Sequence, residues 1–351
     1  MTTEEYKELN NYLNDIFLEL SKNDSFLINN IEFISKINDT FLFYSDKYKI
    51  KNENKENKLT YEEVYLLARE IIESIDKKYL PTYDKLIKSG ELNFDYDQEL
   101  SDSSFLHITR EKDSINLIDI RREFNYIDVI TLVHEYFHYT NGYEDQYSIN
   151  RYLLTEFISI YFEMYAFDYL LDKGIPKEEL KYNDRLDSIY KHSEELNSYE
   201  LVLLSYSKFG NIDENTVNYL NKYICGITKE DFEQECKTTL NNLKKIEKRY
   251  NSEIGSQEYF DQKKFGLKLV EKTTVNYRYV LGTLFAIYAK KYSSIDKMIY
   301  LNDTISQNFD ELYTIFKNID IDINDDNFKN NMVNCIEEYL SRFNSKKEIK
   351  W

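Results

Sequence analysis

Residues that interrupt regular structure are scarce in this chain of 351 residues, which contains only 8 glycines and 2 prolines. So few breakers exclude a collagen-like or loop-dominated protein and favour long helices. Leu, Ile, Tyr, Phe, Lys and Glu are abundant, and the chain is long enough to bury a large hydrophobic core. The composition therefore predicts a mainly helical protein with one compact or two-lobed body.

Cysteine is also rare, and the three residues Cys225, Cys236 and Cys335 form an odd, scattered set without CxxC spacing. They are expected to be free thiols in a reducing compartment rather than disulfides or zinc ligands. Residues 1–5 have neither the basic start nor the apolar core of a secretory signal. The longest apolar run, 279–289, is far too short to span a membrane and suits a buried helix. A cytoplasmic protein without membrane contact is predicted.

Basic side chains are outnumbered, because 45 Lys and Arg face 63 Asp and Glu, and the difference of 45 − 63 gives a net charge of −18. Such a surface repels nucleic acid and anionic lipid and tolerates cationic or neutral partners better. Nucleic-acid partners are therefore not expected. The sequence gives no indication of the oligomeric state.

The order of local patterns predicts three regions. Apolar residues at helical spacing over 3–22 and 25–44 predict an antiparallel helical pair, which forms an N-terminal region of residues 1–50. The polar, low-complexity stretch 51–59 is interpreted as a linker, and 60–351 as the main, catalytic region. Within that region, a capping box at 60–63 opens a helix that is expected to run to about Leu80, before Pro81.

A short β-rich segment precedes the remaining helices. The runs 105–109 and 115–120 are rich in β-formers and are separated by the polar residues 110–114, a pattern typical of a hairpin. From residue 126 onward almost everything follows helical spacing.

Histidine occurs only 4 times, yet His134 and His138 lie four residues apart around Glu135 in an HExxH pattern. On a helix their side chains are offset by about 40° and about 6 Å, so both imidazoles can reach one metal ion. Glu135 would then lie beside the ion and could act as general base on a metal-bound water. The alternative is a helix with two half-buried histidines and a surface glutamate.

A third metal ligand is expected from the apolar helix predicted over 152–163, which nevertheless contains Glu156, Ser159 and Glu163 on one face. Buried carboxylates need a cation or hydrogen-bond donors. The interval of 156 − 138 = 18 positions from the second histidine to Glu156 allows one helix to end, turn and return. Glu156 is therefore assigned as the third ligand, with Ser159 and Glu163 orienting the ligands. Glu144 is the second choice for the ligand, and an internal salt bridge is the alternative role for Glu163.

Two of these motifs resemble those of the M3 metallopeptidases, the oligopeptidase F and thimet oligopeptidase family. The aliphatic run 128–135 is similar to the lead into that family's active-site helix, and 155–163 is similar to its second ligand motif. The likeness extends over about residues 60–290. It implies a zincin-like (gluzincin) core with a small β-sheet ahead of the HExxH helix, one zinc ion, and endopeptidase activity on short peptides. The chain would be a shortened and divergent member, with Phe137 where the family usually has glycine.

Further site residues follow from the same resemblance. The segment 276–282 is similar to the family's tyrosine-rich helix that closes over the substrate, which implies that Tyr277 or Tyr279 donates a hydrogen bond to the oxyanion. His107, in the predicted hairpin, is a candidate substrate contact, whereas His192 is expected to be solvated. A catalytically silent peptide- or protein-binding relative and a metallo-exopeptidase are the alternatives, although a pure binding module would not need Glu135.

Overall fold

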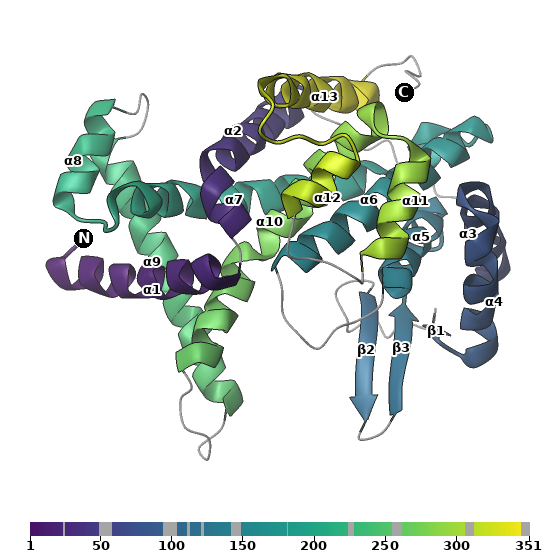
Figure 1. Cartoon of the computed structure of the whole chain (residues 1–351), viewed down its shortest axis with the longest axis horizontal. Helices are drawn as coiled ribbons and strands as arrows, with labels where there is room; N and C mark the ends of the chain where they lie inside the picture. Colours follow the sequence, from purple (N-terminus) through teal and green to yellow (C-terminus); the bar gives the residue numbers. More distant parts are fainter. Residues whose placement is uncertain are drawn as a thin grey trace. The chain divides into compact units, whose positions relative to one another are not determined.

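The computed structural model describes most of the chain (Figure 1). The described residues are 1–23, 25–48, 58–93, 104–110, 113–120, 123–141, 149–180, 182–223, 228–254, 262–305 and 312–344. The predicted linker at 51–59 falls almost entirely outside these ranges. None of the described helices combines the length and the apolar character that crossing a membrane requires.

Helices dominate the structure, as predicted. They are α1 (Thr3–Asn23), α2 (Ser25–Lys47), α3 (Tyr61–Ile75), α4 (Leu80–Ser89), α5 (Tyr126–Asn141), α6 (Ile149–Asp172), α7 (Tyr182–Phe209), α8 (Glu214–Tyr223), α9 (Lys229–Ile254), α10 (Gln262–Tyr292), α11 (Ile295–Thr304), α12 (Leu312–Asn318) and α13 (Asp326–Asn344). Two short 3-10 helices, η1 (Lys77–Tyr79) and η2 (Lys177–Glu179), and the strands β1 (Leu92–Asn93), β2 (Ser104–Arg110) and β3 (Asp113–Asp119) complete the described elements. The mainly α fold with a small sheet ahead of the HExxH helix is therefore confirmed.

The chain forms two compact units, which are not consecutive in sequence. The first contains residues 1–42 and 190–280, and the second contains 43–189 and 281–351. This grouping by packing differs from the sequential division at 51–59, because the N-terminal helices pack with residues from the middle of the chain.

In the first unit, α1 packs mainly against α9 rather than against α2, so the predicted antiparallel pair of N-terminal helices is not the main contact. The amino group of Met1 lies 2.9 Å from a Glu233 carboxylate oxygen, and Lys244 Nζ lies 2.6 Å from Glu8. Both predicted helices exist, but helical periodicity says only that a face is buried. It does not say which distant helix covers that face.

In the second unit, the predicted hairpin is confirmed. β2 and β3 pair antiparallel, with His107 opposite Asn116, and the short strand β1 pairs parallel to the other side of β3. The strand order is β1-β3-β2, so β2 lies at an edge of the sheet formed by the described strands (Figure 1).

The helices ahead of the sheet support α5. The Thr60–Glu63 capping box is present, but α3 ends at Ile75, because Asp76 is extended and begins the short helix η1. α3 packs against α5. From α4, the Tyr83 ring meets the Tyr136 ring edge-on with 5.2 Å between centroids, and the Tyr136 hydroxyl donates to the Tyr79 carbonyl at 2.7 Å. The HExxH helix is thereby fixed on one side by buried aromatic contacts.

The described cysteines are free and buried. Cys236 and Cys335 form no disulfide, and burial raises the pKa of each thiol to about 12. Buried thiols with such a raised pKa are chemically inert. Cys225 lies outside the described residues.

Candidate metal centre

The start of α5 is fixed by a carboxylate. Asp128, which is 1% exposed, accepts the backbone N–H groups of Glu123 and Phe124 at 2.8 and 2.9 Å. Asn125 Oδ1 accepts the Ile127 N–H at 2.8 Å. A carboxylate in the first turn also interacts favourably with the helix dipole. The helix that carries the HExxH pattern therefore begins at a defined position.

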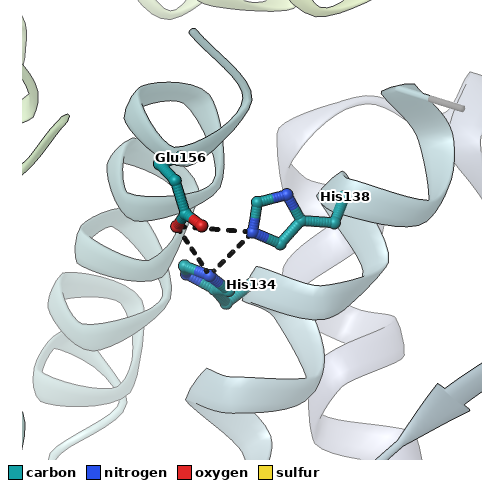
Figure 2. Close-up of side chains that lie close together, drawn as sticks. All are labelled: His134, His138 and Glu156. Atoms are coloured by element: carbon teal, nitrogen blue, oxygen red, sulfur yellow. Dashed lines mark hydrogen bonds and ion pairs between the residues drawn. The ribbon is translucent and has the colours of Figure 1, made fainter. Parts of the chain in front are cut away.

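Three predicted ligands meet between α5 and α6 (Figure 2). His134 and His138 of α5 point their Nε2 atoms toward each other at 3.0 Å. Glu156 Oε2 of α6 lies 3.7 Å from His134 Nε2 and 3.5 Å from His138 Nε2. Among the described residues, these form the one group of three or more His, Cys, Asp or Glu side chains arranged to hold a metal ion. His134 and Glu156 are each 6% exposed.

The distances and donor types suit zinc. Zinc–nitrogen and zinc–oxygen bonds of about 2.0–2.2 Å in tetrahedral geometry place neighbouring ligand atoms about 3.3 Å apart. The three observed separations, 3.0, 3.5 and 3.7 Å, bracket that value. A carboxylate can only accept hydrogen bonds, so it gives no proton to either imidazole. A shared cation would satisfy all three groups at once.

A second carboxylate fixes the orientation of His134. Its Nδ1 lies 2.8 Å from Glu163 Oε2, and Arg185 Nε donates to Glu163 Oε1 at 3.1 Å. A proton on Nδ1 would let His134 donate to this carboxylate and would leave the Nε2 lone pair available to a metal ion. Burial raises the pKa of the Glu163 carboxyl, but Arg185 and His134 outweigh burial, so this pKa lies below its ordinary value. Glu163 therefore lies between His134 and Arg185 and forms an ion pair with Arg185, while its role in orienting a metal ligand stays a prediction.

Glu135 and Ser159 differ from the ligands in what surrounds them. Glu135 is 7% exposed, and no hydrogen bond or ion pair to its carboxylate is found among the described residues. Ser159 is fully buried on α6, and its hydroxyl likewise has no hydrogen-bond partner within the described part of the chain. The roles of Glu135 as general base and of Ser159 as a ligand-orienting group stay predictions.

The contact between α5 and α6 explains the phenylalanine of the motif. Phe137 is fully buried, and its ring stacks on that of Phe162 of α6 with 3.8 Å between centroids. The Tyr79 ring meets the Phe137 ring edge-on, with 5.4 Å between centroids. A glycine at this position would lose both contacts, so in this chain the separation of the two ligand helices is set by stacked rings.

Arg185 is the site residue that the sequence did not predict. It lies in α7, 22 residues after Glu163 and within the second unit. Nothing in the spacing of Arg185 distinguishes it from the other basic residues of the chain. Only the pairing rule for buried carboxylates indicated that some cation had to be present.

The structure leaves the roles of the other predicted residues as predictions. Glu144 lies outside the described residues. His107 lies on β2, and its role as a substrate contact stays a prediction. Tyr277 is 2% exposed and lies with Tyr279 in the part of α10 that belongs to the first unit. Their role as oxyanion donors also stays a prediction.

The expectation that His192 is solvated is wrong. His192 is partly buried in the first unit, where its Nδ1 lies 2.8 Å from Asn276 Oδ1. Its ring stacks on that of Tyr279 with 4.7 Å between centroids and 17° between planes. The charged sequence neighbours of His192 suggested exposure, but α10 covers this face of α7.

Comparisons with known proteins give only distant likenesses. No protein-family model matches the sequence, and no curated protein matches it. Among solved structures, a proposed peptidase from Chlamydophila abortus shares 15% identity and a TM-score of 0.49, covering 91% of this chain and 54% of that one. A proposed oligoendopeptidase F from Bacillus anthracis strain Ames shares 12% identity and a TM-score of 0.47, covering 95% of this chain and 56% of that one. This chain thus spans about half the length of both proteins. Neither likeness is strong enough to support a function.

Proposed function

We propose that this protein is a zinc-dependent peptidase with a zincin-like (gluzincin) core of the M3 type, which hydrolyses bonds in short peptides. The observation that supports the proposal is the convergence of His134 Nε2, His138 Nε2 and Glu156 Oε2 within 4.8 Å of one another. These three side chains would hold one zinc ion. A zinc ion bound there would polarise the scissile carbonyl and lower the pKa of a bound water.

The protein's own groups have distinct tasks in this proposal. Glu135 takes a proton from the attacking water and passes it to the leaving amine. Glu163 keeps the His134 ring in the tautomer that presents Nε2, and Arg185 holds Glu163 in place. Tyr277 or Tyr279 is the proposed hydrogen-bond donor to the oxyanion.

The proposed substrates are extended peptides. β2 has a partner strand on one side in the described sheet, so its other edge offers backbone groups to which a peptide could add as a strand. His107 lies on this strand and is the proposed side-chain contact. The net charge of −18 favours cationic or neutral peptides over acidic ones. The free thiols Cys236 and Cys335 suit a reducing, cytoplasmic location.

Two alternatives use the same residues. A silent relative would bind peptides without cleaving them, and a metallo-exopeptidase would remove terminal residues. The nearly buried carboxylate of Glu135, to which no described residue donates a hydrogen bond, favours catalysis over silent binding. Analysis of the products from a mixed peptide pool distinguishes internal cleavage from removal of terminal residues.

The test is metal analysis combined with peptide hydrolysis. The wild type is expected to hold one zinc per chain and to cleave peptides, whereas Glu156→Ala should bind zinc much more weakly, through the two remaining histidines, and lose peptide hydrolysis because one of three ligands is removed. Glu62→Ala, on an exposed position of α3, is the matched control and should behave as wild type. Full zinc occupancy and unchanged affinity in Glu156→Ala would refute this ligand set.

A further inference from the structure

Gly282 lies in α10 at the point where this helix meets α6 beside the third ligand, and both residues belong to the second unit. A Cβ atom built on Gly282 would lie 3.1 Å from the backbone nitrogen of Phe157. The same Cβ would lie 3.4 Å from both the carbonyl carbon and the Cβ of Glu156. The glycine thus faces the backbone of the turn that carries the ligand, not the flexible end of a side chain.

The contact is not relieved easily by movement of either helix. α10 is held on α6 by an aromatic cluster in which the Phe285 ring lies 6.4 Å from that of Phe157 and 4.8 Å from that of Phe316. α6 is also held against α5 by the Phe137–Phe162 stack. Interiors packed in this way transmit small displacements rather than absorb them.

We propose that Gly282 is a positioning residue for the metal centre: its missing side chain lets α10 approach α6 closely enough to place Glu156 against the two histidines. The inference rests on the proposed function, because it assigns to Glu156 the role of metal ligand. Metal–ligand distances tolerate deviations of only about 0.2 Å. A displacement of a few tenths of an ångström at Glu156 would therefore act directly on metal affinity.

The discriminating variant is Gly282→Ala. Alanine favours helix more than glycine does, so a purely local view predicts a protein that is unchanged or more stable. If Gly282 positions Glu156, the zinc dissociation constant should rise by about tenfold, the lower end of what outer-shell changes cost. Affinity is measured by competition with a chelator, and circular dichroism and thermal unfolding of the metal-free proteins report the fold.

Two further variants show whether the effect passes through the ligand. Ala289→Ser adds one heavy atom to another fully buried position of α10, seven residues further on, and should leave zinc affinity within about twofold. In the Glu156→Ala background, Gly282→Ala should cause no additional loss, because the residue through which it acts is gone. If Gly282→Ala does not fold, Phe285→Leu loosens the same crossing more gently. Phe285→Leu should weaken zinc binding in the protein that keeps Glu156 and should cause no additional loss in the Glu156→Ala background.

Several outcomes would overturn the inference. Zinc affinity of Gly282→Ala within twofold of wild type would remove it, as would an equal loss in the wild-type and Glu156→Ala backgrounds. Failure of the proposed function has a different signature, since Glu156→Ala would then bind zinc as tightly as wild type. Gly282 could not act through Glu156 in that case, and the inference would fall as well.

Discussion

At the scale of single residues, the chemistry of the site depends on what each of three glutamates contacts. The carboxylate of Glu156 faces two imidazole nitrogens, and that of Glu163 lies between the His134 imidazole and Arg185. Glu135 has no described partner at all, although it is nearly buried. In the proposed function the same side chain would thus serve as ligand, orienting group and general base according to its surroundings.

This division predicts opposite signatures for two conservative substitutions. Glu135→Gln should keep full zinc affinity while hydrolysis falls by about a hundredfold or more, because the amide cannot accept a proton. Glu163→Gln should instead weaken zinc binding by about tenfold to a hundredfold, since it loses the charge that pairs with Arg185 and His134. Chelator competition and peptide turnover on both variants, with the fold checked by circular dichroism, give the comparison. Substantial turnover by zinc-loaded Glu135→Gln, or wild-type zinc affinity in Glu163→Gln, would reverse these assignments.

At the scale of elements, an ion pair joins α3 to α4, and these two helices pack beside the helix that carries the histidines. Arg69 donates from Nε and Nη2 to the two carboxylate oxygens of Asp84 at 2.7 and 3.0 Å, and the Tyr65 hydroxyl donates at 3.1 Å. The hydrogen bonds from Arg69 hold the pKa of the Asp84 carboxyl below its ordinary value of 3.8. A group with a lowered pKa in the folded state stabilises that state above its unfolded pKa and ceases to do so as the pH falls through the folded pKa.

Asp84→Asn should therefore lower the free energy of unfolding by about 1 kcal/mol at neutral pH, the upper range for a partly exposed pair with bidentate geometry. The difference from wild type should shrink as the pH falls below about 4, where Asp84 takes up a proton. Urea unfolding at neutral pH and at several lower values measures this difference. Glu194→Gln, on an exposed position in the interior of α7, is the control. A deficit that stays constant down to the lowest pH would mean that the ion pair does not stabilise the fold.

The elements that could be predicted from the sequence are those specified by neighbouring residues. The HExxH spacing, the capping box at Thr60 and the alternation of the β2–β3 hairpin are all local, and the structure contains each of them. Glu156 could be placed because a carboxylate in an apolar helix requires a cation. Contacts between distant segments were not predictable. These are the packing of α1 on α9, the partnership of Arg185 with Glu163, and the approach of Gly282 to the backbone of Glu156. The strand β1 is only two residues long, too short to produce a pattern.

At the scale of the whole molecule, the burial of the cluster limits what can reach it. The side chain of His138 is 15% exposed, and those of His134 and Glu156 are 7% and 8% exposed. If the proposed function holds, a scissile bond must come within bonding distance of groups that are almost closed off from solvent. A folded protein surface cannot do this without local unfolding, whereas a single extended strand can.

Short, unstructured peptides are therefore expected to be cleaved much faster than folded proteins. The experiment compares a ladder of peptides of increasing length with one protein in its folded form and in a permanently unfolded form, such as a reduced and alkylated chain. Both forms contain the same peptide bonds, so they differ only in whether an extended segment is available. The unfolded form should be cut and the folded form should resist, while Glu135→Gln should cut neither. Efficient cleavage of the folded form at an ordered site would show that the metal centre is reached without unfolding, and the restriction to extended peptides would then be wrong.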